Sequence, residues 1–131
     1  MRKRSLRASP DPVPKSVRWV GESKSDLSVF PHDVKLRIGG ALWDAQIGLK
    51  SPAAKPLKGF GGAGVLEVVA DFDGNAFRTV YTVRFAEAVY VLHAFQKKSR
   101  RGIATPKAEL ELIRTRLARA KEDYEQWLRN R

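Results

Sequence analysis

Residues 65–95 read VLEVVADFDGNAFRTVYTVRFAEAVYVLHAF and carry the clearest secondary-structure signal of the chain. Apolar and β-branched side chains fill residues 65–72 and 76–85, and Asp73-Gly74 stands between them. An Asp-Gly pair accepts the positive φ angles of a tight two-residue turn. The stretch therefore predicts a β-hairpin made of these two strands.

The second arm of this hairpin alternates along its length. One side carries Phe77, Thr79, Tyr81, Val83 and Phe85, and the other carries Arg78, Val80, Thr82 and Arg84. Residues 89–95 alternate as well, with His93 on the side of Val91 and Phe95, and they are apolar on both sides. That pattern is typical of a central strand. We therefore expect a meander of three antiparallel strands.

The segments before the hairpin predict a short strand, a helix and a loop. Residues 15–20 alternate like a strand, and residues 26–49 carry apolar side chains at helical spacing, with Pro31 suited to a first turn. A short turn of helix over residues 25–30 is expected to precede this helix. Gly39-Gly40 inside this helix predicts close packing against a neighbouring element. Residues 51–64 predict a basic loop.

The segment after the meander predicts one long helix. Thr105-Pro106 supplies an N-cap and a first-turn proline. Apolar side chains then recur at three-and-four spacing, at Leu110, Ile113, Leu117, Ala120, Tyr124 and Trp127. The fold class expected for residues 15–131 is therefore α+β, a single domain with helical segments before the strand meander and a long helix after it.

Composition narrows the classes of function. The chain has 25 Lys and Arg against 14 Asp and Glu, a net charge of +11, which favours a polyanionic partner such as nucleic acid. Cysteine is absent, and His32 and His93 show no metal-ligand spacing, so we expect no metal or other cofactor. Apolar runs fall far short of the ~20 residues of a membrane-spanning helix. We expect a cytoplasmic location, no membrane partner and a disordered basic tail over residues 1–14.

Cations gather in three places along the chain. They are Lys50, Lys55 and Lys58 near the loop, Arg78 and Arg84 on one side of a strand, and Lys97, Lys98, Arg100 and Arg101 after the last strand. Glu67 is expected to pair with a nearby arginine. If these places converge, the surface suits phosphate binding and the charge that develops at a scissile phosphate.

Four short motifs follow one another: KPLKGF at 55–60, VLEV at 65–68, AFRTVY at 76–81 and VLHAFQKK at 91–98. In this order they resemble the RelE/ParE toxin superfamily, and in particular its phage-derived HigB-like branch. The resemblance spans nearly the whole chain after residue 15. It implies a small RelE-like fold, in which N-terminal helices pack on an antiparallel sheet, and a cognate helix-turn-helix antitoxin as partner.

The resemblance also implies the toxin of a type II toxin–antitoxin system that cleaves messenger RNA on the ribosome without a metal ion. In that reaction the 2′-hydroxyl of the RNA attacks the adjacent phosphate, so the protein supplies proton transfer and cations. By the resemblance, Arg78 and Lys97 contact the phosphate, and His93 and Tyr81 are the available acid and base groups. The supporting RNA-binding cations are Lys55, Lys58, Lys98, Arg100 and Arg101.

Alternatives remain at the level of residues and of function. Tyr81 shares its side with apolar neighbours, as a core residue would, and the apolar side of His93 favours a buried structural histidine over a catalytic one. RelE ends in a catalytic tyrosine, whereas residues 101–106 contain none and lead into the long helix. ParE-like members bind DNA gyrase and have no nuclease site. A phage accessory protein that binds nucleic acid is a third reading.

Overall fold

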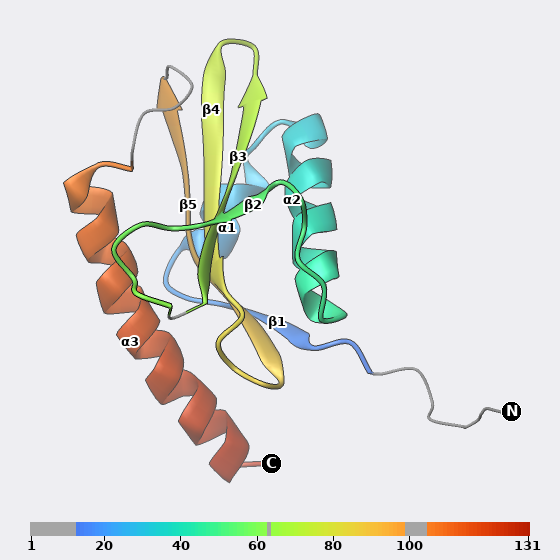
Figure 1. Ribbon diagram of the computed structural model, residues 1–131, viewed down its shortest axis with the longest axis vertical. Helices are drawn as coiled ribbons and strands as arrows, with labels where there is room; N and C mark the ends of the chain where they lie inside the picture. Colours follow the sequence, from blue (N-terminus) through green and yellow to red (C-terminus); the bar gives the residue numbers. More distant parts are fainter. Residues whose placement is uncertain (1–12, 63, 99–104) are drawn as a thin grey trace, which may run out of the picture.

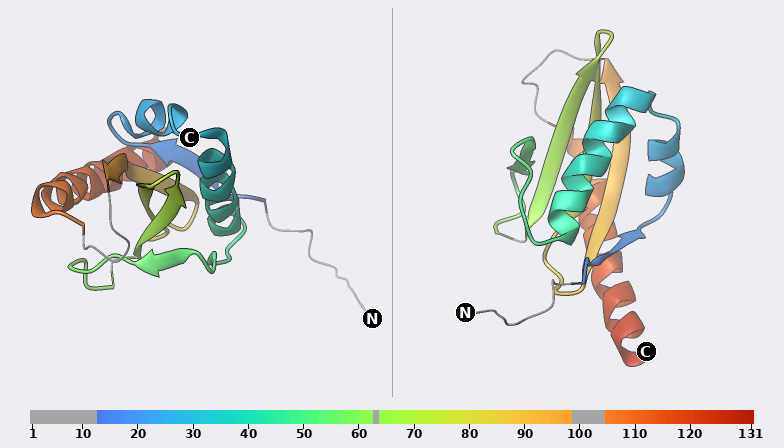
Figure 2. Two further views of the ribbon diagram at one scale, coloured as in Figure 1. Left: turned by 90° about the horizontal axis from the view of Figure 1, so that it is seen from above. Right: turned by 90° about the vertical axis from the view of Figure 1, so that its right-hand side faces the viewer.

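The computed structural model describes residues 13–62, 64–98 and 105–131. Its elements in chain order are β1 (Ser16–Trp19), α1 (Ser23–Ser28), α2 (His32–Gln46), β2 (Ala54–Pro56), β3 (Val65–Phe72), β4 (Asn75–Thr82), β5 (Ala88–Lys98) and α3 (Lys107–Arg129). These strands form one sheet in the order β1-β5-β4-β3-β2, with α2 on one face and α3 on the other (Figures 1 and 2). The predicted α+β class with a long C-terminal helix is confirmed. None of the helices in the described segments has the length and apolar content to cross a membrane.

The β3–β4 hairpin forms where the sequence predicts it. Phe72 pairs with Asn75 across Asp73 and Gly74, whose φ angles are 52° and 79°. Positive φ values at both turn positions suit the twist of hairpin strands. β5 pairs with β4 in antiparallel orientation, so the predicted meander is also confirmed.

The sheet as a whole is mixed, which differs from the antiparallel sheet that we expected. β1 lies parallel to β5, with Val17 opposite Val89. The predicted loop over residues 51–64 contains β2, which pairs with β3. A three-residue strand carries too short a pattern to be recognised without its partner.

The single helix predicted over residues 26–49 is two helices. α1 ends at Ser28 and α2 begins at His32, because Pro31 occupies the N-cap position of α2. Proline has no amide hydrogen to continue the first helix, but its carbonyl accepts the first bond of the second, from Lys35 N at 2.9 Å. The helix predicted over residues 26–49 is thus confirmed only from His32 to Gln46, and α1 corresponds to the short helical turn expected over residues 25–30.

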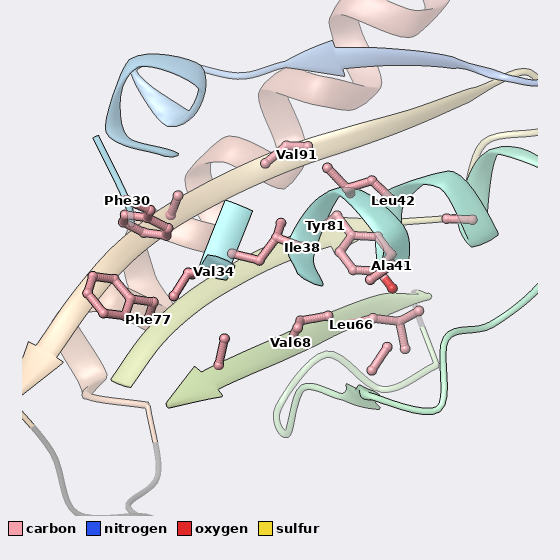
Figure 3. Close-up of a cluster of buried hydrophobic side chains, with 14 of the residues drawn as sticks. Phe30, Val34, Ile38, Ala41, Leu42, Leu66, Val68, Phe77, Tyr81 and Val91 are labelled. Atoms are coloured by element: carbon pink, nitrogen blue, oxygen red, sulfur yellow. The ribbon is translucent and has the colours of Figure 1, made fainter. Parts of the chain in front are cut away.

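Two hydrophobic clusters fill the two faces of the sheet. The cluster under α2 is drawn in Figure 3 and includes Val34, Ile38, Leu42, Val68, Tyr81 and Val91. The cluster under α3 includes Val80, Tyr90, Leu92, Ile113, Ala120 and Tyr124. The apolar seam predicted for the last helix therefore packs on the sheet.

The prediction that Gly39-Gly40 packs closely against a neighbour is wrong. Both glycines are exposed, and a Cβ atom added at either would meet no atom within 4 Å. They lie on the outer side of α2, where Leu36 and Trp43 are also exposed. Nothing in the described part of the chain requires glycine at these two positions.

The C-terminal half of α3 is fastened to the sheet by polar contacts. Arg18 of β1 donates to Asp123 at 3.0 Å, and the Tyr90 hydroxyl donates to the same carboxylate at 2.6 Å. These bonds lower the pKa of Asp123. Arg131 forms an ion pair with Glu87 in the turn between β4 and β5. Packing and ion pairs together hold this end of the helix in place.

Candidate functional site

The pairing register puts four of the nine predicted site residues, Lys55, Arg78, His93 and Lys97, on one side of the sheet, which we call the α3 face. Residues opposite one another on neighbouring strands share a face. The rows of this face are Lys55–Glu67–Val80–His93, Val69–Arg78–Phe95 and Asp71–Ala76–Lys97. Lys97 is a diagonal neighbour of Arg78, about 7–8 Å away in such a ladder. Three strands therefore bring Lys55, Arg78 and Lys97 to one surface.

A β-bulge in β5 sets the position of His93. Tyr81 pairs with Val91, but the preceding Val80 pairs with His93, so Leu92 is an extra residue between them. An extra residue reverses the alternation of side chains beyond it. His93 therefore lies on the α3 face and Val91 on the other, and the predicted placement of both on one side is wrong.

Arg78 is held in a compact polar triad. Its side chain is buried, and Nη1 donates to Glu67 Oε1 at 3.3 Å and to Thr105 Oγ1 at 3.4 Å. The Thr105 hydroxyl in turn donates to Glu67 Oε2 at 2.8 Å. The expected pairing of Glu67 with an arginine is confirmed. Thr105 does not cap α3 as predicted, because its hydroxyl is engaged by this carboxylate and Pro106 is the N-cap residue.

His93 is fixed by two side chains of α3. Its Nε2 lies 3.1 Å from Glu109 Oε1, and Arg116 Nη1 donates to Nδ1 at 3.3 Å. Because arginine can only donate, Nδ1 accepts from Arg116, and the protonated Nε2 donates a hydrogen bond to Glu109. The ring also stacks on Phe95, with centroids 4.7 Å apart. His93 is thus a buried histidine with both nitrogens bonded.

Tyr81 lies on the opposite side of the sheet from these residues. Its ring packs beneath α2 in the cluster of Figure 3, and only 1% of the residue is exposed. Burial, and secondarily the charge of Asp44, raises the pKa of its hydroxyl to about 12. The fold therefore separates Tyr81 from Arg78 and His93.

The lysines differ in how they meet solvent. Lys55 and Lys58 are exposed, and Lys97 is half-buried near the end of β5. Arg114 of α3 donates to Gly59 O at 3.1 Å and lies 5.0 Å from the centroid of the Phe60 ring, so it holds the loop that carries Lys58. Lys98 is the last residue of β5, while Arg100 and Arg101 lie outside the described residues, as do residues 1–12 of the predicted tail.

Sequence reasoning missed three residues of this site: Thr105, Glu109 and Arg116. Glu109 and Arg116 stand seven positions apart, on either side of the buried Ile113, so both flank the apolar seam that the spacing predicts. This offset could have been used to predict that both side chains lie beside the sheet. Thr105 gave none, because a threonine before a proline reads as a helix cap. The described residues contain no group of three or more His, Asp or Glu side chains that could hold a metal ion.

Comparisons with known proteins give one family and one structural neighbour. Residues 25–118 match the sequence model of the family described as "Phage derived protein Gp49-like (DUF891)". A chain of the toxin–antitoxin complex RelBE2 from Mycobacterium tuberculosis is 21% identical, covering 66% of this chain and 95% of that one, with a TM-score of 0.38. No curated protein matches.

Proposed function

Because the chain belongs to the phage-derived Gp49-like family, we propose that it is the toxin of a toxin–antitoxin pair and that it cleaves messenger RNA on the ribosome. The observation that carries this proposal is the convergence of Lys55, Arg78 and Lys97 on the α3 face from three different strands. The order of the four motifs, typical of HigB-like toxins, supports it. Because ribosomes are in the cytoplasm, the proposed activity is a cytoplasmic one.

The proposed reaction uses the RNA as its own nucleophile. The 2′-hydroxyl loses its proton and attacks the neighbouring phosphate, and negative charge builds on the phosphoryl oxygens in the transition state. The bond from phosphorus to the 5′-oxygen of the next nucleotide breaks, and that oxygen takes up a proton, which leaves a 2′,3′-cyclic phosphate and a 5′-hydroxyl. Fixed cations in a partly dry site stabilise that charge. Lys97 and Arg78 take this role, while the exposed Lys55 and Lys58 hold flanking phosphates in a salt-dependent way.

Proton transfer falls to the His93 and Glu109 pair. The bonds from Arg116 and to Glu109 set one tautomer, with the proton on Nε2. To exchange a proton with RNA, the ring must give up its bond to Glu109. Replacing His93 by glutamine should therefore slow cleavage about 10²–10⁴-fold if the ring transfers the proton. A purely structural ring predicts a lower melting temperature with near-normal cleavage.

The antitoxin is proposed to cover the α3 face with an acidic segment. Complementary charge speeds association of the two proteins. An antitoxin segment bound over Lys55 and Lys97 also blocks the binding of RNA to these lysines. Reversing the charge at Lys55 should slow association most at low salt. Unchanged association would place the antitoxin on another surface.

Induced expression without an antitoxin tests the function directly. Growth and protein synthesis should stop, and primer extension should find new 5′ ends inside the codons of translated messages. Intact messages together with altered DNA supercoiling would replace this proposal with gyrase inhibition. Growth without any of these effects would leave only an accessory nucleic-acid-binding role.

A further inference from the structure

The central arginine of the proposed site is closed off from solvent. Arg78 is 3% exposed, although Lys55 in the neighbouring row is exposed. Phosphate oxygens must lie within hydrogen-bond distance of a guanidinium to bind it. An RNA strand therefore cannot contact Arg78 in the arrangement described above, and the site must open first.

Of the two described partners of Arg78 Nη1, one belongs to the hairpin and one does not. Glu67 and Arg78 sit on adjacent strands of one hairpin, so the sheet fixes their relation. Thr105 comes from outside the hairpin, just before α3, and bonds to both partners at 2.8 Å and 3.4 Å. Its hydroxyl is thus bonded to both members of the ion pair.

The helix α3, which follows Thr105, is held too firmly to be the moving part. Ile113, Ala120 and Tyr124 are buried against the sheet, and Asp123 is bonded to Arg18 and Tyr90. Displacing the whole helix would break these contacts together. Opening at Thr105 requires the loss of two hydrogen bonds and leaves the seam intact.

We infer that Thr105 is a latch that keeps Arg78 paired with Glu67 until RNA binds. When the latch opens, a phosphate replaces Glu67 on the guanidinium, as charge-assisted Arg–phosphate pairs are strong and geometrically well matched. This inference rests on the proposed function, since it takes RNA phosphate as the ligand. It adds that the described conformation is the closed, inactive form of the site.

If Thr105 is a latch, its removal should tighten RNA binding rather than weaken it. If only a small open fraction binds RNA, the apparent dissociation constant is the intrinsic constant divided by that fraction. Replacing Thr105 by valine removes the hydroxyl but keeps the shape of the side chain. Since each hydrogen bond contributes a modest net stabilisation, RNA should bind about 3- to 10-fold more tightly.

The experiment compares the parental chain with Thr105→Val, Thr105→Ser and Thr115→Val. Serine keeps the hydroxyl and should restore parental behaviour. Thr115 is the matched control, because it is exposed on α3 and its hydroxyl bonds only to Glu111 O of its own helix among the described contacts. Programmed ribosomes give KM and kcat for cleavage, and a 2′-O-methyl RNA that cannot be cleaved gives affinity.

The inference predicts a lower KM and unchanged kcat for Thr105→Val, with parental values for the other two variants. An arginine-selective reagent read by mass spectrometry should also modify Arg78 faster in Thr105→Val. An unchanged or higher KM, or a lower kcat, would overturn the latch and make Thr105 a structural or positioning residue. If the parental chain binds the RNA but never cleaves it, the proposed function fails, while tighter binding by Thr105→Val still supports the latch.

Discussion

The side of the sheet under α2 and the side under α3 both bury large apolar clusters, but among the described residues only the α3 face also buries an ion pair. Under α2, Ile38 and Tyr81 pack among aliphatic and aromatic neighbours. On the α3 face, Arg78 and Glu67 have side-chain exposures of only 4% and 12%. Removing charges from water is expensive, and a hydrophobic pair of similar volume is often at least as stable. The α3 face is therefore organised for something other than stability alone.

The largest expected effect comes from breaking this buried pair. Glu67→Leu leaves the buried Arg78 without this carboxylate and should lower the free energy of unfolding by about 3–5 kcal/mol. The double change Glu67→Leu with Arg78→Met should recover most of that loss. Urea denaturation measures both. A single variant as stable as the parental chain would show that the pair is solvated rather than buried.

The stability of the chain at alkaline pH tests the burial of Tyr81 on the α2 side of the sheet. Its folded-state pKa of about 12 lies above the ordinary value of 10.0, so between these pH values the folded chain keeps a proton that the unfolded chain releases. The stability from this group is complete below pH 10 and is lost as the pH rises toward 12. Tyr81→Phe should weaken this alkaline decline, measured by denaturation at several pH values.

The same variant separates packing from catalysis. Among the described residues, no hydrogen-bond partner lies within reach of the Tyr81 hydroxyl. Removing it at neutral pH should therefore change stability by no more than about 1 kcal/mol, and RNA cleavage should persist. Loss of cleavage with the fold intact would return Tyr81 to the active site.

The smallest expected effect lies on the outer side of α2. Gly39→Ala and Gly40→Ala should each stabilise the chain by about 0.5–1 kcal/mol, because alanine favours helix and a Cβ atom meets nothing within 4 Å. Gly74 is the matched control: it has equal space, but its φ of +79° should make alanine destabilising. Thermal unfolding reports all three. A loss of stability at Gly39 or Gly40 would mean that α2 has a neighbour outside the described residues.

Local patterns were enough to predict the hairpin and the last helix. Asp73-Gly74 and the alternation around it specify a turn and two strands, and the seam through Ile113 specifies a helix face. β2 and the parallel pairing of β1 were not predictable in the same way, because very short strands are specified by the partners they meet. The alternation of residues 15–20 gives no direction of pairing.

The candidate site was predicted only in part, because its geometry depends on one inserted residue. Strand alternation correctly grouped Arg78 with Val80 and put Tyr81 on the other side. It assigned His93 to the wrong face, since the bulge at Leu92 shifts the register by one and leaves no mark in the hydrophobic pattern. Thr105 was read as a cap because its partner Glu67 lies 38 residues away in sequence.

The most direct test compares one cationic residue of the α3 face with one of the α2 side in a purified ribosome cleavage assay. Lys97→Ala removes a cation beside Arg78, whereas Arg37→Ala removes an exposed cation from α2. Cleavage on the α3 face predicts that kcat falls about 10²–10³-fold for Lys97→Ala, the scale for losing one preorganised group, and does not change for Arg37→Ala. Equal cleavage by the two variants would contradict the placement of the active site on the α3 face.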